Sequence, residues 1–277
     1  MKKIGILGNP LSHSLSPVMH NAAIKHLKLN LEFEKWEITQ NSLEEFFSNL
    51  EKNQIIGGCV TIPFKEELFN YCSDLHDSVK RIGAINWFRS ERGEIRGYNT
   101  DHIGFYNSLP EQIKKSLNNI NIVVIGAGGS SKAVVESLIS KGSKKLSIIN
   151  RTIKNAEYIS SKYPNSNIIT AKIDDRHSEN LIRDANLIIN TTSLGMSSGP
   201  HPHNSIVQDI RLNKDVVGFD LVYSPIKTPF LNAIENCGGK AITGISMLIH
   251  QAIEGLELIT GENCPYEIME KSIISEL

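Results

Sequence analysis

A short glycine-rich segment most constrains how this chain can fold. The apolar run Ile122-Val123-Val124-Ile125 leads into Gly126-Ala127-Gly128-Gly129-Ser130-Ser131. Gly126 would allow a sharp turn from strand to helix, and Gly128 would let a phosphate approach the backbone. Ser131 stands where Gly or Ala is usual, and it is still small enough for close packing. Because a helix starting near Ser130 would point its free N–H groups at an anion, the segment predicts a dinucleotide-binding strand–turn–helix unit.

A second polar segment indicates which dinucleotide binds. Asn150, Arg151 and Thr152 follow a second apolar run that ends Ile148-Ile149, and Lys154 comes shortly after. Sites that take NAD place Asp or Glu at this point, on the ribose hydroxyls. A carboxylate would repel the 2′-phosphate of NADP, whereas the guanidinium of Arg151 would pair with it. We therefore predict NADP as the cofactor, with a solvated basic turn as the alternative.

Charge and hydropathy exclude several classes of protein. The 277 residues carry a formal net charge of −1, which gives no attraction to nucleic acid or to an anionic membrane. No apolar run approaches the length of a membrane span. The start Met1-Lys2-Lys3-Ile4-Gly5 leads into a predicted strand rather than a signal peptide. We expect a cytoplasmic protein that binds a small molecule, and neither nucleic acid nor membrane.

Cysteine and histidine usage gives no sign of a disulfide or a metal. The four cysteines lack any Cys-x-x-Cys spacing, which is typical of free thiols in a reducing compartment; they are Cys59, Cys72, Cys237 and Cys264. His201 and His203 lie in a loop that contains Gly and Pro, with no third ligand nearby. We therefore predict no metal site.

Two stretches of the chain alternate predicted strands with predicted helices. In the first, we expect strands at 4–8, 31–38, 55–61, 84–89 and 94–98, with a hairpin turn at Arg92-Gly93. Helices are expected from Ser16 as a cap with Pro17 in the first turn, from Ser42 as a cap, from Phe64 and near His76. In the second, strands are expected at 122–125, 146–149, 167–170, 187–190 and 216–220, and a helix follows at 245–259.

Such an alternation predicts an α/β fold. We expect two α/β domains with a cleft between them. Residues 1–101 and 237–277 would form a mostly parallel substrate-binding and catalytic domain, and residues 102–236 a Rossmann NADP-binding domain. Ligands of such sheets bind outside the carboxyl ends of the strands, which makes the cleft the expected active site.

Four polar clusters of the first stretch fall in loops or at strand ends, where catalytic groups are commonly presented. They are Ser14 with Ser16, Thr61 with Lys65, Asn86, and Asn99-Thr100-Asp101. Each also has a purely structural interpretation, because Ser16 and Asp101 could cap helices, Lys65 could be a surface charge and Asn86 could satisfy a turn. Their common position at one end of a single sheet favours a binding site.

At this point the chain resembles the shikimate dehydrogenase family. The resemblance spans nearly the whole chain, in the family's order. Its strings are Gly-Asn-Pro-Leu-Ser-His-Ser-Leu-Ser-Pro (8–17), Thr-Ile-Pro-Phe-Lys (61–65), Gly-Ala-Ile-Asn (83–86), Gly-Tyr-Asn-Thr-Asp (97–101), the glycine turn, Asn-Arg-Thr, Asn-Thr-Thr-Ser-Leu-Gly-Met (190–196), Asp-Leu-Val-Tyr-Ser-Pro (220–225) and Gln251. It implies reversible NADPH-dependent reduction of 3-dehydroshikimate to shikimate, in aromatic amino-acid and chorismate biosynthesis.

The resemblance also implies a role for each matching residue. Lys65 and Asp101 would be the catalytic pair. The substrate carboxylate would be held by Ser14, Ser16 and Tyr223, and the ring hydroxyls by Thr61, Asn86, Asp101 and Gln251, with Lys65 also in contact. The cofactor would be lined by Gly126, Ala127, Gly128, Gly129, Ser130, Asn150, Arg151, Thr152, Lys154, Leu221 and Gly244, and the position of Asp77 would lie near the nicotinamide.

One residue departs from the family's pattern. After the asparagine of the Gly-Ala-x-Asn string the family usually has a small polar residue, commonly Thr, whereas this chain has Trp87. Because successive side chains of a strand point to opposite faces, we expect the indole to point away from the Asn86 side chain. The alternative is an indole that packs behind the substrate pocket or narrows it.

Two other functions stay open. One is a quinate/shikimate dehydrogenase with relaxed choice of substrate or cofactor, and Asn150-Arg151-Thr152 argues against a preference for NAD. The other is a non-catalytic NADPH-binding sensor, which would have no need of Lys65 and Asp101 together. A monomer or a homodimer would be compatible with either.

Overall fold

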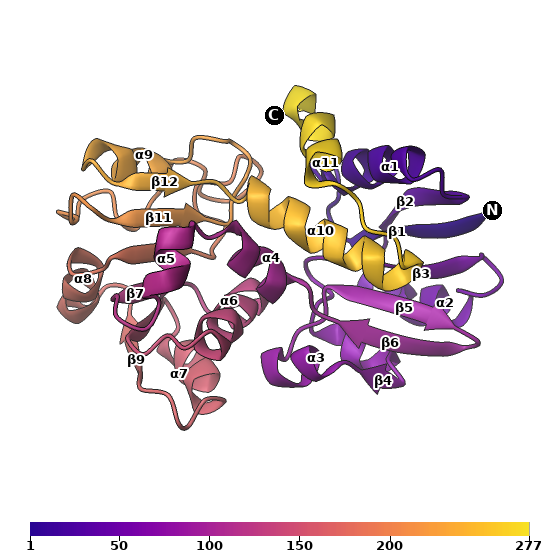
Figure 1. Cartoon of the computed structure of the whole chain (residues 1–277). Helices are drawn as coiled ribbons and strands as arrows, with labels where there is room; N and C mark the ends of the chain where they lie inside the picture. Colours follow the sequence, from indigo (N-terminus) through magenta and orange to yellow (C-terminus); the bar gives the residue numbers. More distant parts are fainter. Residues whose placement is uncertain (277) are drawn as a thin grey trace. The chain divides into compact units, whose positions relative to one another are not determined.

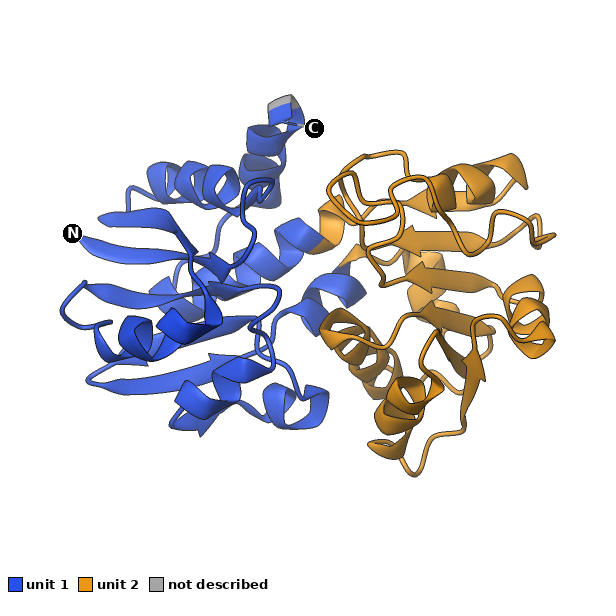
Figure 2. Cartoon of the chain, turned by 180° about the vertical axis from the view of Figure 1, so that it is seen from behind, with its two compact units in different colours: residues 1–107, 248–277 blue, residues 108–247 orange. Residues whose placement is uncertain are grey.

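The computed structural model describes residues 1–276 and divides the chain into two compact units (Figure 2). Unit 1 comprises Met1–Asn107 and the chain from Leu248 onward, and unit 2 comprises Ser108–Met247. Each unit has its own six-stranded sheet flanked by helices (Figure 1). The predicted α/β fold with two α/β domains is confirmed.

The sheet of unit 1 is mostly parallel, in the strand order β2-β1-β3-β5-β6-β4. Its strands are β1 (Lys2–Gly8), β2 (Leu31–Glu37), β3 (Ile55–Val60), β4 (Asp74–Leu75), β5 (Trp87–Glu91) and β6 (Glu94–Tyr98). Only β5 runs antiparallel to its neighbours, β3 and β6. The tight β5–β6 hairpin explains this, because Arg92 and Gly93 both have positive φ, as the favoured two-residue turn requires.

The helices of unit 1 are α1 (Ser16–His26), α2 (Leu43–Ser48), α3 (Asp77–Ile82), α4 (Asp101–Ser108), most of α10 (Ile245–Thr260) and α11 (Tyr266–Ile273). The predicted cap at Ser16 is wrong, because Leu15 is the N-cap of α1 and Ser16 is its first residue. Ser42 is the N-cap of α2 as predicted, but without a side-chain hydrogen bond to the helix. The helix predicted from Phe64 is also wrong, and only a 3₁₀ turn forms at Glu67–Tyr71. The Lys65 carbonyl accepts from the Ile85 N–H at 2.7 Å, so it is engaged outside a helix.

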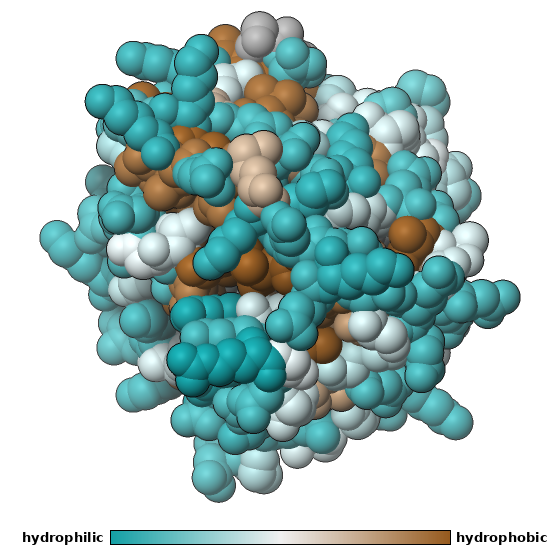
Figure 3. Space-filling view, turned by 90° about the vertical axis from the view of Figure 1, so that its right-hand side faces the viewer, coloured by the Kyte–Doolittle hydropathy of each residue, from teal (hydrophilic) through white to brown (hydrophobic). Residues whose placement is uncertain are grey.

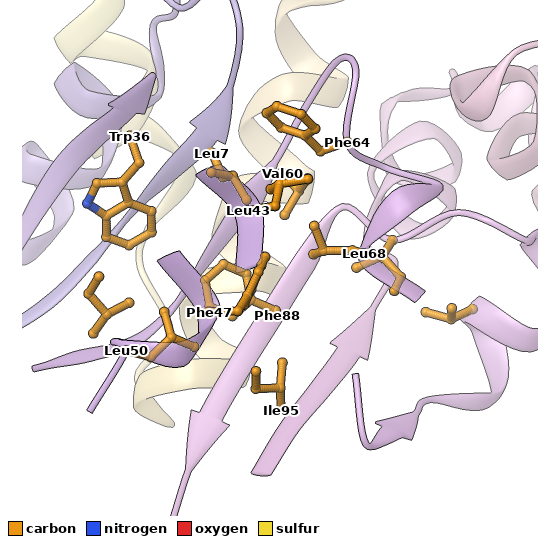
Figure 4. Packing of buried hydrophobic residues seen from close by; sticks show 13 residues of the cluster. Leu7, Trp36, Leu43, Phe47, Leu50, Val60, Phe64, Leu68, Phe88 and Ile95 are labelled. Carbon is orange, nitrogen blue, oxygen red and sulfur yellow. The ribbon is translucent and has the colours of Figure 1, made fainter. Parts of the chain in front are cut away.

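One hydrophobic cluster of unit 1 packs α2 against a face of this sheet (Figure 4). Phe47 and Leu43 of α2 are buried with Leu7 of β1 and Phe88 of β5. The ring of Phe88 lies 5.4 Å from that of Phe47, in an edge-on arrangement. Aromatic pairs of this kind add about 0.5–1.5 kcal/mol beyond the burial of their area, so this cluster fixes where β5 sits.

The sheet of unit 2 is entirely parallel, in the order β12-β11-β10-β7-β8-β9. Its strands are β7 (Ile122–Ile125), β8 (Leu146–Asn150), β9 (Ile168–Lys172), β10 (Leu187–Asn190), β11 (Val217–Asp220) and β12 (Lys240–Ile242). Counted from β7, this is the strand order of the doubly wound dinucleotide-binding fold, which reverses direction between β7 and β10. The Rossmann architecture predicted for this part of the chain is confirmed.

The helices of unit 2 are α5 (Glu111–Ser116), α6 (Gly129–Ser140), α7 (Ile153–Ser161), α8 (Arg176–Arg183) and α9 (Pro229–Asn236). The unit extends past residue 236, where we expected it to end, because β12 adds a sixth parallel strand beside β11. At its other end, unit 1 keeps residues 102–107, since α4 starts at Asp101 inside the polar cluster of unit 1.

Hydrophilic residues dominate the face of the molecule drawn in Figure 3, with hydrophobic ones in small groups between them. Among residues 1–276, no helix is both long and apolar enough to cross a membrane.

Candidate functional site

A lysine and a carboxylate form an ion pair at the carboxyl ends of the strands of unit 1. Lys65 Nζ lies 2.5 Å from Asp101 Oδ2, and their side chains are 17% and 8% exposed. Lys65 sits in the loop after β3, and Asp101 is the first residue of α4. Such a pair has little water to screen it, so it can hold or move a proton in a fixed geometry.

Asn86 connects this ion pair to the rest of the cluster. Its Nδ2 donates to Asp101 Oδ1 at 2.8 Å and to Thr100 Oγ1 at 3.0 Å, and it lies 3.3 Å from Gln251 Oε1. Its Oδ1 accepts from the Thr100 N–H at 2.7 Å. The structure therefore brings Lys65, Asn86, Asp101 and Gln251 into one hydrogen-bonded cluster, although Gln251 comes from α10, far along the chain.

The other predicted substrate residues of unit 1 lie after β3 and at the start of α1. Thr61 is half-buried at the end of β3, where its N–H donates to the Leu7 carbonyl at 2.9 Å. Ser14 is half-buried, and its hydroxyl accepts from the Ser16 N–H at 3.3 Å. Ser16 is buried, as is Cys59, and burial raises the pKa of the Cys59 thiol to about 12.

Two predicted residues are not among the members of this hydrogen-bonded cluster. Tyr223 belongs to unit 2, where it is half-buried in the segment after β11. Asp77 is in the first turn of α3, where it is exposed and lies 3.4 Å from Lys80. Their roles toward substrate and cofactor stay predictions.

The glycine turn of unit 2 has the geometry of a phosphate cradle. Gly126 has a φ of +109°, and a Cβ there would collide with Thr191 Oγ1. Gly128 is the N-cap of α6, and a Cβ there would meet nothing within 4 Å. The space beside Gly128 is therefore open to a ligand. The Ser131 hydroxyl donates to the Gly126 carbonyl at 2.8 Å, so this departure from Gly or Ala adds a bond that fixes the turn.

Exposed cations follow β8, next along the sheet from that turn. Arg151, Thr152 and Lys154 are all exposed, and Arg151 forms no ion pair within residues 1–276. Asn150 Nδ2 donates to the Thr152 carbonyl at 2.9 Å, which shapes the turn that presents Arg151. These groups suit a phosphate, and the first turn of α6 carries no acidic residue that would oppose one.

Leu221 and Gly244 come together although 22 residues separate them in the sequence. A Cβ on Gly244 would collide with the Leu221 carbonyl, so the close approach of the two segments requires glycine. Ala127, Gly129 and Ser130 lie in the turn or the first turn of α6. The predicted cofactor residues of unit 2 thus cluster at the carboxyl ends of its strands.

Two residues at these sites, Thr100 and Asp220, were given no individual binding or catalytic role in our sequence predictions. Thr100 links Asn86 to the Gln251 carbonyl, to which its hydroxyl donates at 2.9 Å. Asp220 is buried and accepts from Asn190 at 2.9 Å and from Thr228 at 2.5 Å. Burial raises the pKa of Asp220 to about 6.

The expected orientation of Trp87 is wrong. Its indole Nε1 donates to Gln251 Oε1 at 3.3 Å, the same oxygen that Asn86 Nδ2 approaches. Asn86 precedes β5, so the alternation of side chains in a regular strand does not extend to it. The indole of Trp87 is long enough to reach Gln251 on α10.

No group of three or more His, Cys, Asp or Glu side chains that could hold a metal is found within residues 1–276. The four cysteines are free thiols.

Unit 2, with its strand order, glycine turn and cationic loop, defines a dinucleotide-binding α/β protein. The family model described as shikimate dehydrogenase substrate binding domain matches residues 6–88. Models described as shikimate / quinate 5-dehydrogenase and shikimate 5'-dehydrogenase C-terminal domain match residues 108–221 and 244–274. The chain belongs to the shikimate dehydrogenase family.

Individual relatives agree over the whole length. A shikimate dehydrogenase (NADP(+)) of Methanopyrus kandleri is 34% identical over 277 residues, covering 99% of this chain and 95% of its own. A shikimate dehydrogenase crystallised with NADP+ is 32% identical with a TM-score of 0.90, covering 100% and 96% of the two chains. The enzyme of Thermus thermophilus, solved with NADP(H) and shikimate, is 28% identical with a TM-score of 0.84 and full coverage of both chains.

Proposed function

We propose that this protein is an NADP-dependent oxidoreductase that interconverts 3-dehydroshikimate and shikimate, on the route to chorismate and the aromatic amino acids. The observation that carries the proposal is the buried Lys65–Asp101 ion pair, joined through Asn86 to Gln251, in a chain of the shikimate dehydrogenase family. Its relatives and structural neighbours include shikimate dehydrogenases that are named for NADP or were solved with it, which supports this activity and cofactor.

In the proposed reaction, NADPH supplies the hydride when it is bound. Lys65 donates a proton to the oxygen of the carbonyl as negative charge develops on it, and accepts that proton back in the reverse direction. Asp101 orients the Lys65 ammonium through Oδ2. Asn86 donates to Oδ1 of the same carboxylate and so holds the pair in place.

The remaining polar groups would bind the substrate. Ser14, Ser16 and Tyr223 would hold its carboxylate, and Thr61, Asn86, Asp101 and Gln251 its hydroxyls. All of these except Tyr223 belong to unit 1, so the proposal assigns substrate binding mainly to unit 1 and cofactor binding to unit 2.

The residues of unit 2 fit NADP. The open space beside Gly128 and the free N–H groups of α6 suit a pyrophosphate, to which residues 126–130 would bind. Arg151, with Asn150, Thr152 and Lys154, would contact the 2′-phosphate, and Leu221 and Gly244 would line the cofactor. We also assign Asp77 to the nicotinamide end.

Two alternatives differ in what they require. A relaxed quinate/shikimate dehydrogenase would keep the same ion pair, and a non-catalytic NADPH sensor would not need it. A buried ion pair costs desolvation, so it is unexpected in a protein that only binds. We propose that the enzyme works in the cytoplasm and without nucleic acid. We also propose that it is a monomer or a homodimer, and its mass in gel filtration would test this oligomeric state.

The experiment that tests this function removes the proton donor. Lys65→Ala should lower kcat for NADP-dependent oxidation of shikimate by about 10²–10⁴-fold, the usual size of a general acid–base contribution, with a modest change in KM. NADPH binding, followed by its fluorescence, should persist. The matched control is Lys3→Ala, which removes a lysine from another ion pair of unit 1, 2.6 Å from Glu34, and should leave kcat unchanged. Near-normal activity in Lys65→Ala would refute the proposed role of the pair.

A further inference from the structure

Trp87 is buried between the sheet of unit 1 and α10. It is 1% exposed, and its ring lies 5.5 Å from that of His20 on α1. On α10, a Cβ at Gly255 would collide with the indole, so the helix can lie against the ring only because residue 255 is glycine. One face of the ring is thus fixed by packing, and its Nε1 points at Gln251 Oε1, 3.3 Å away.

The Asn86 amide cannot satisfy all of its neighbours. Its Nδ2 carries two hydrogens but lies near three acceptors, Asp101 Oδ1 at 2.8 Å, Thr100 Oγ1 at 3.0 Å and Gln251 Oε1 at 3.3 Å. The contact with Gln251 is the longest of the three. With both hydrogens on Asp101 and Thr100, Gln251 Oε1 depends on Trp87 for its donor.

Trp87 also decides which way the Gln251 amide faces. An indole N–H can only donate and a backbone carbonyl can only accept. Gln251 Oε1 faces Trp87 Nε1, while Gln251 Nε2 donates to the Leu248 carbonyl at 2.8 Å. A flipped amide would set its NH₂ against the indole N–H and its oxygen against the carbonyl, and would lose both bonds. In the observed orientation, Nε2 keeps one further hydrogen to donate.

We propose that Trp87 is a positioning residue for substrate binding, which locks the Gln251 amide so that Nε2 is presented as a donor to a hydroxyl of the substrate. This rests on the proposed function, in which Gln251 contacts the substrate. Gly255 contributes to this positioning, because the absence of a side chain at residue 255 leaves space for the indole.

The test compares Trp87→Phe in two backgrounds. The phenyl ring keeps most of the packing and removes the N–H. Losing a neutral hydrogen bond of this kind should raise the Kd for shikimate in titration calorimetry, and its KM, about threefold to tenfold. The kcat and the KM for NADP should change little. In a Gln251→Ala background, Trp87→Phe should have no further effect on Kd, because the residue acts through Gln251.

Two more variants separate positioning from packing. Gly255→Ala should also raise the Kd, because its methyl group would move the indole, which keeps its N–H, away from Gln251. Phe88→Leu truncates the neighbouring buried aromatic, on the opposite face of β5, and should lower the melting temperature without changing the Kd.

An unchanged Kd for shikimate in Trp87→Phe would overturn the positioning role of Trp87. So would a rise in this Kd that is equally large in the wild-type and Gln251→Ala backgrounds. A wild-type protein that binds shikimate without turning it over would refute the proposed activity alone, and the Kd comparison would still decide the role of Trp87. A wild-type protein that does not bind shikimate at all would refute both.

Discussion

Neutral groups, rather than an arginine, would hold the substrate carboxylate in this protein. Ser14, Ser16 and Tyr223 carry hydroxyls, and a hydroxyl holds an anion less tightly than a guanidinium fork does. Moderate affinity and ready release of product follow from such a set.

At the scale of single residues, we predict that these hydroxyls affect binding more than chemistry. Ser14→Ala and Tyr223→Phe should each raise the KM for shikimate more than they lower kcat, in steady-state kinetics at saturating NADP. The Ser14 hydroxyl also accepts from the Ser16 N–H, so the melting temperature of that variant should be checked alongside. A fall in kcat with an unchanged KM would instead assign these residues to the chemical step.

Asp220 makes the stability of unit 2 depend on pH. Its pKa rises from 3.8 to about 6, chiefly because burial disfavours the charged carboxylate. Between these two values the folded chain binds the proton more tightly than the unfolded chain does. The contribution of Asp220 to stability is therefore present below about pH 4 and is lost as pH rises toward 6, by about 3 kcal/mol at most.

Asp220→Asn should remove this dependence. The free energy of unfolding of the wild type, minus that of the variant, should be larger at pH 4 than at pH 7, in urea titrations at both values. The difference cancels the titration of all other groups. A difference that stays constant between the two pH values would contradict the raised pKa.

The proximity of residues that lie in short family strings could be predicted from the sequence, whereas contacts that depend on packing could not. The string 61–65 and the string 97–101 singled out Lys65 and Asp101 as a pair, and the structure places them 2.5 Å apart. The contact of Trp87 with Gln251 depends on where α10 lies, and the pKa of Asp220 depends on burial between strands. Neither the contact nor the pKa can be predicted from residues that are adjacent in the sequence.

At the scale of elements, two glycines of the turn before α6 are expected to differ in their roles, one in cofactor binding and one also in folding. Gly128 has a φ of −96° and open space around it, so Gly128→Val should fold normally but raise the KM for NADP at least tenfold by blocking the pyrophosphate. Gly126 has a φ of +109°, so Gly126→Val should also lower the melting temperature.

Melting curves without cofactor, together with NADP kinetics, test this contrast. A Gly128→Val protein with a normal KM for NADP would mean that the space beside residue 128 does not hold the cofactor.

Strands were predicted best where a buried strand has a mostly apolar sequence. The predicted strands at 122–125, 146–149 and 187–190 are confirmed, because parallel strands covered on both faces are rich in apolar residues. The sixth strand, β12, was missed, since its sequence Lys240-Ala241-Ile242 is short and begins with a charge. The predicted cap at Ser16 was one residue off, and Ser42 caps α2 without a side-chain bond, because a serine before an apolar stretch indicates a helix start without specifying its geometry.

At the scale of the whole molecule, the chain builds each unit from its own sheet but closes unit 1 only with its last segment. Gln251 and Gly255 of α10 reach Asn86 and Trp87, about 165 residues earlier in the sequence. The candidate catalytic cluster is therefore complete only when the carboxyl-terminal helices have folded back onto unit 1, in line with our expectation that the last segment joins residues 1–101.

The central claim is that this chain oxidises shikimate with NADP. The most direct test is the initial rate of nicotinamide reduction at 340 nm, with shikimate or quinate crossed against NADP or NAD. We predict turnover mainly with shikimate and NADP. Comparable rates with quinate or with NAD would contradict the predicted specificity and leave the Lys65–Asp101 chemistry in place. NADPH binding without turnover in any combination would contradict the enzyme function and favour the sensor.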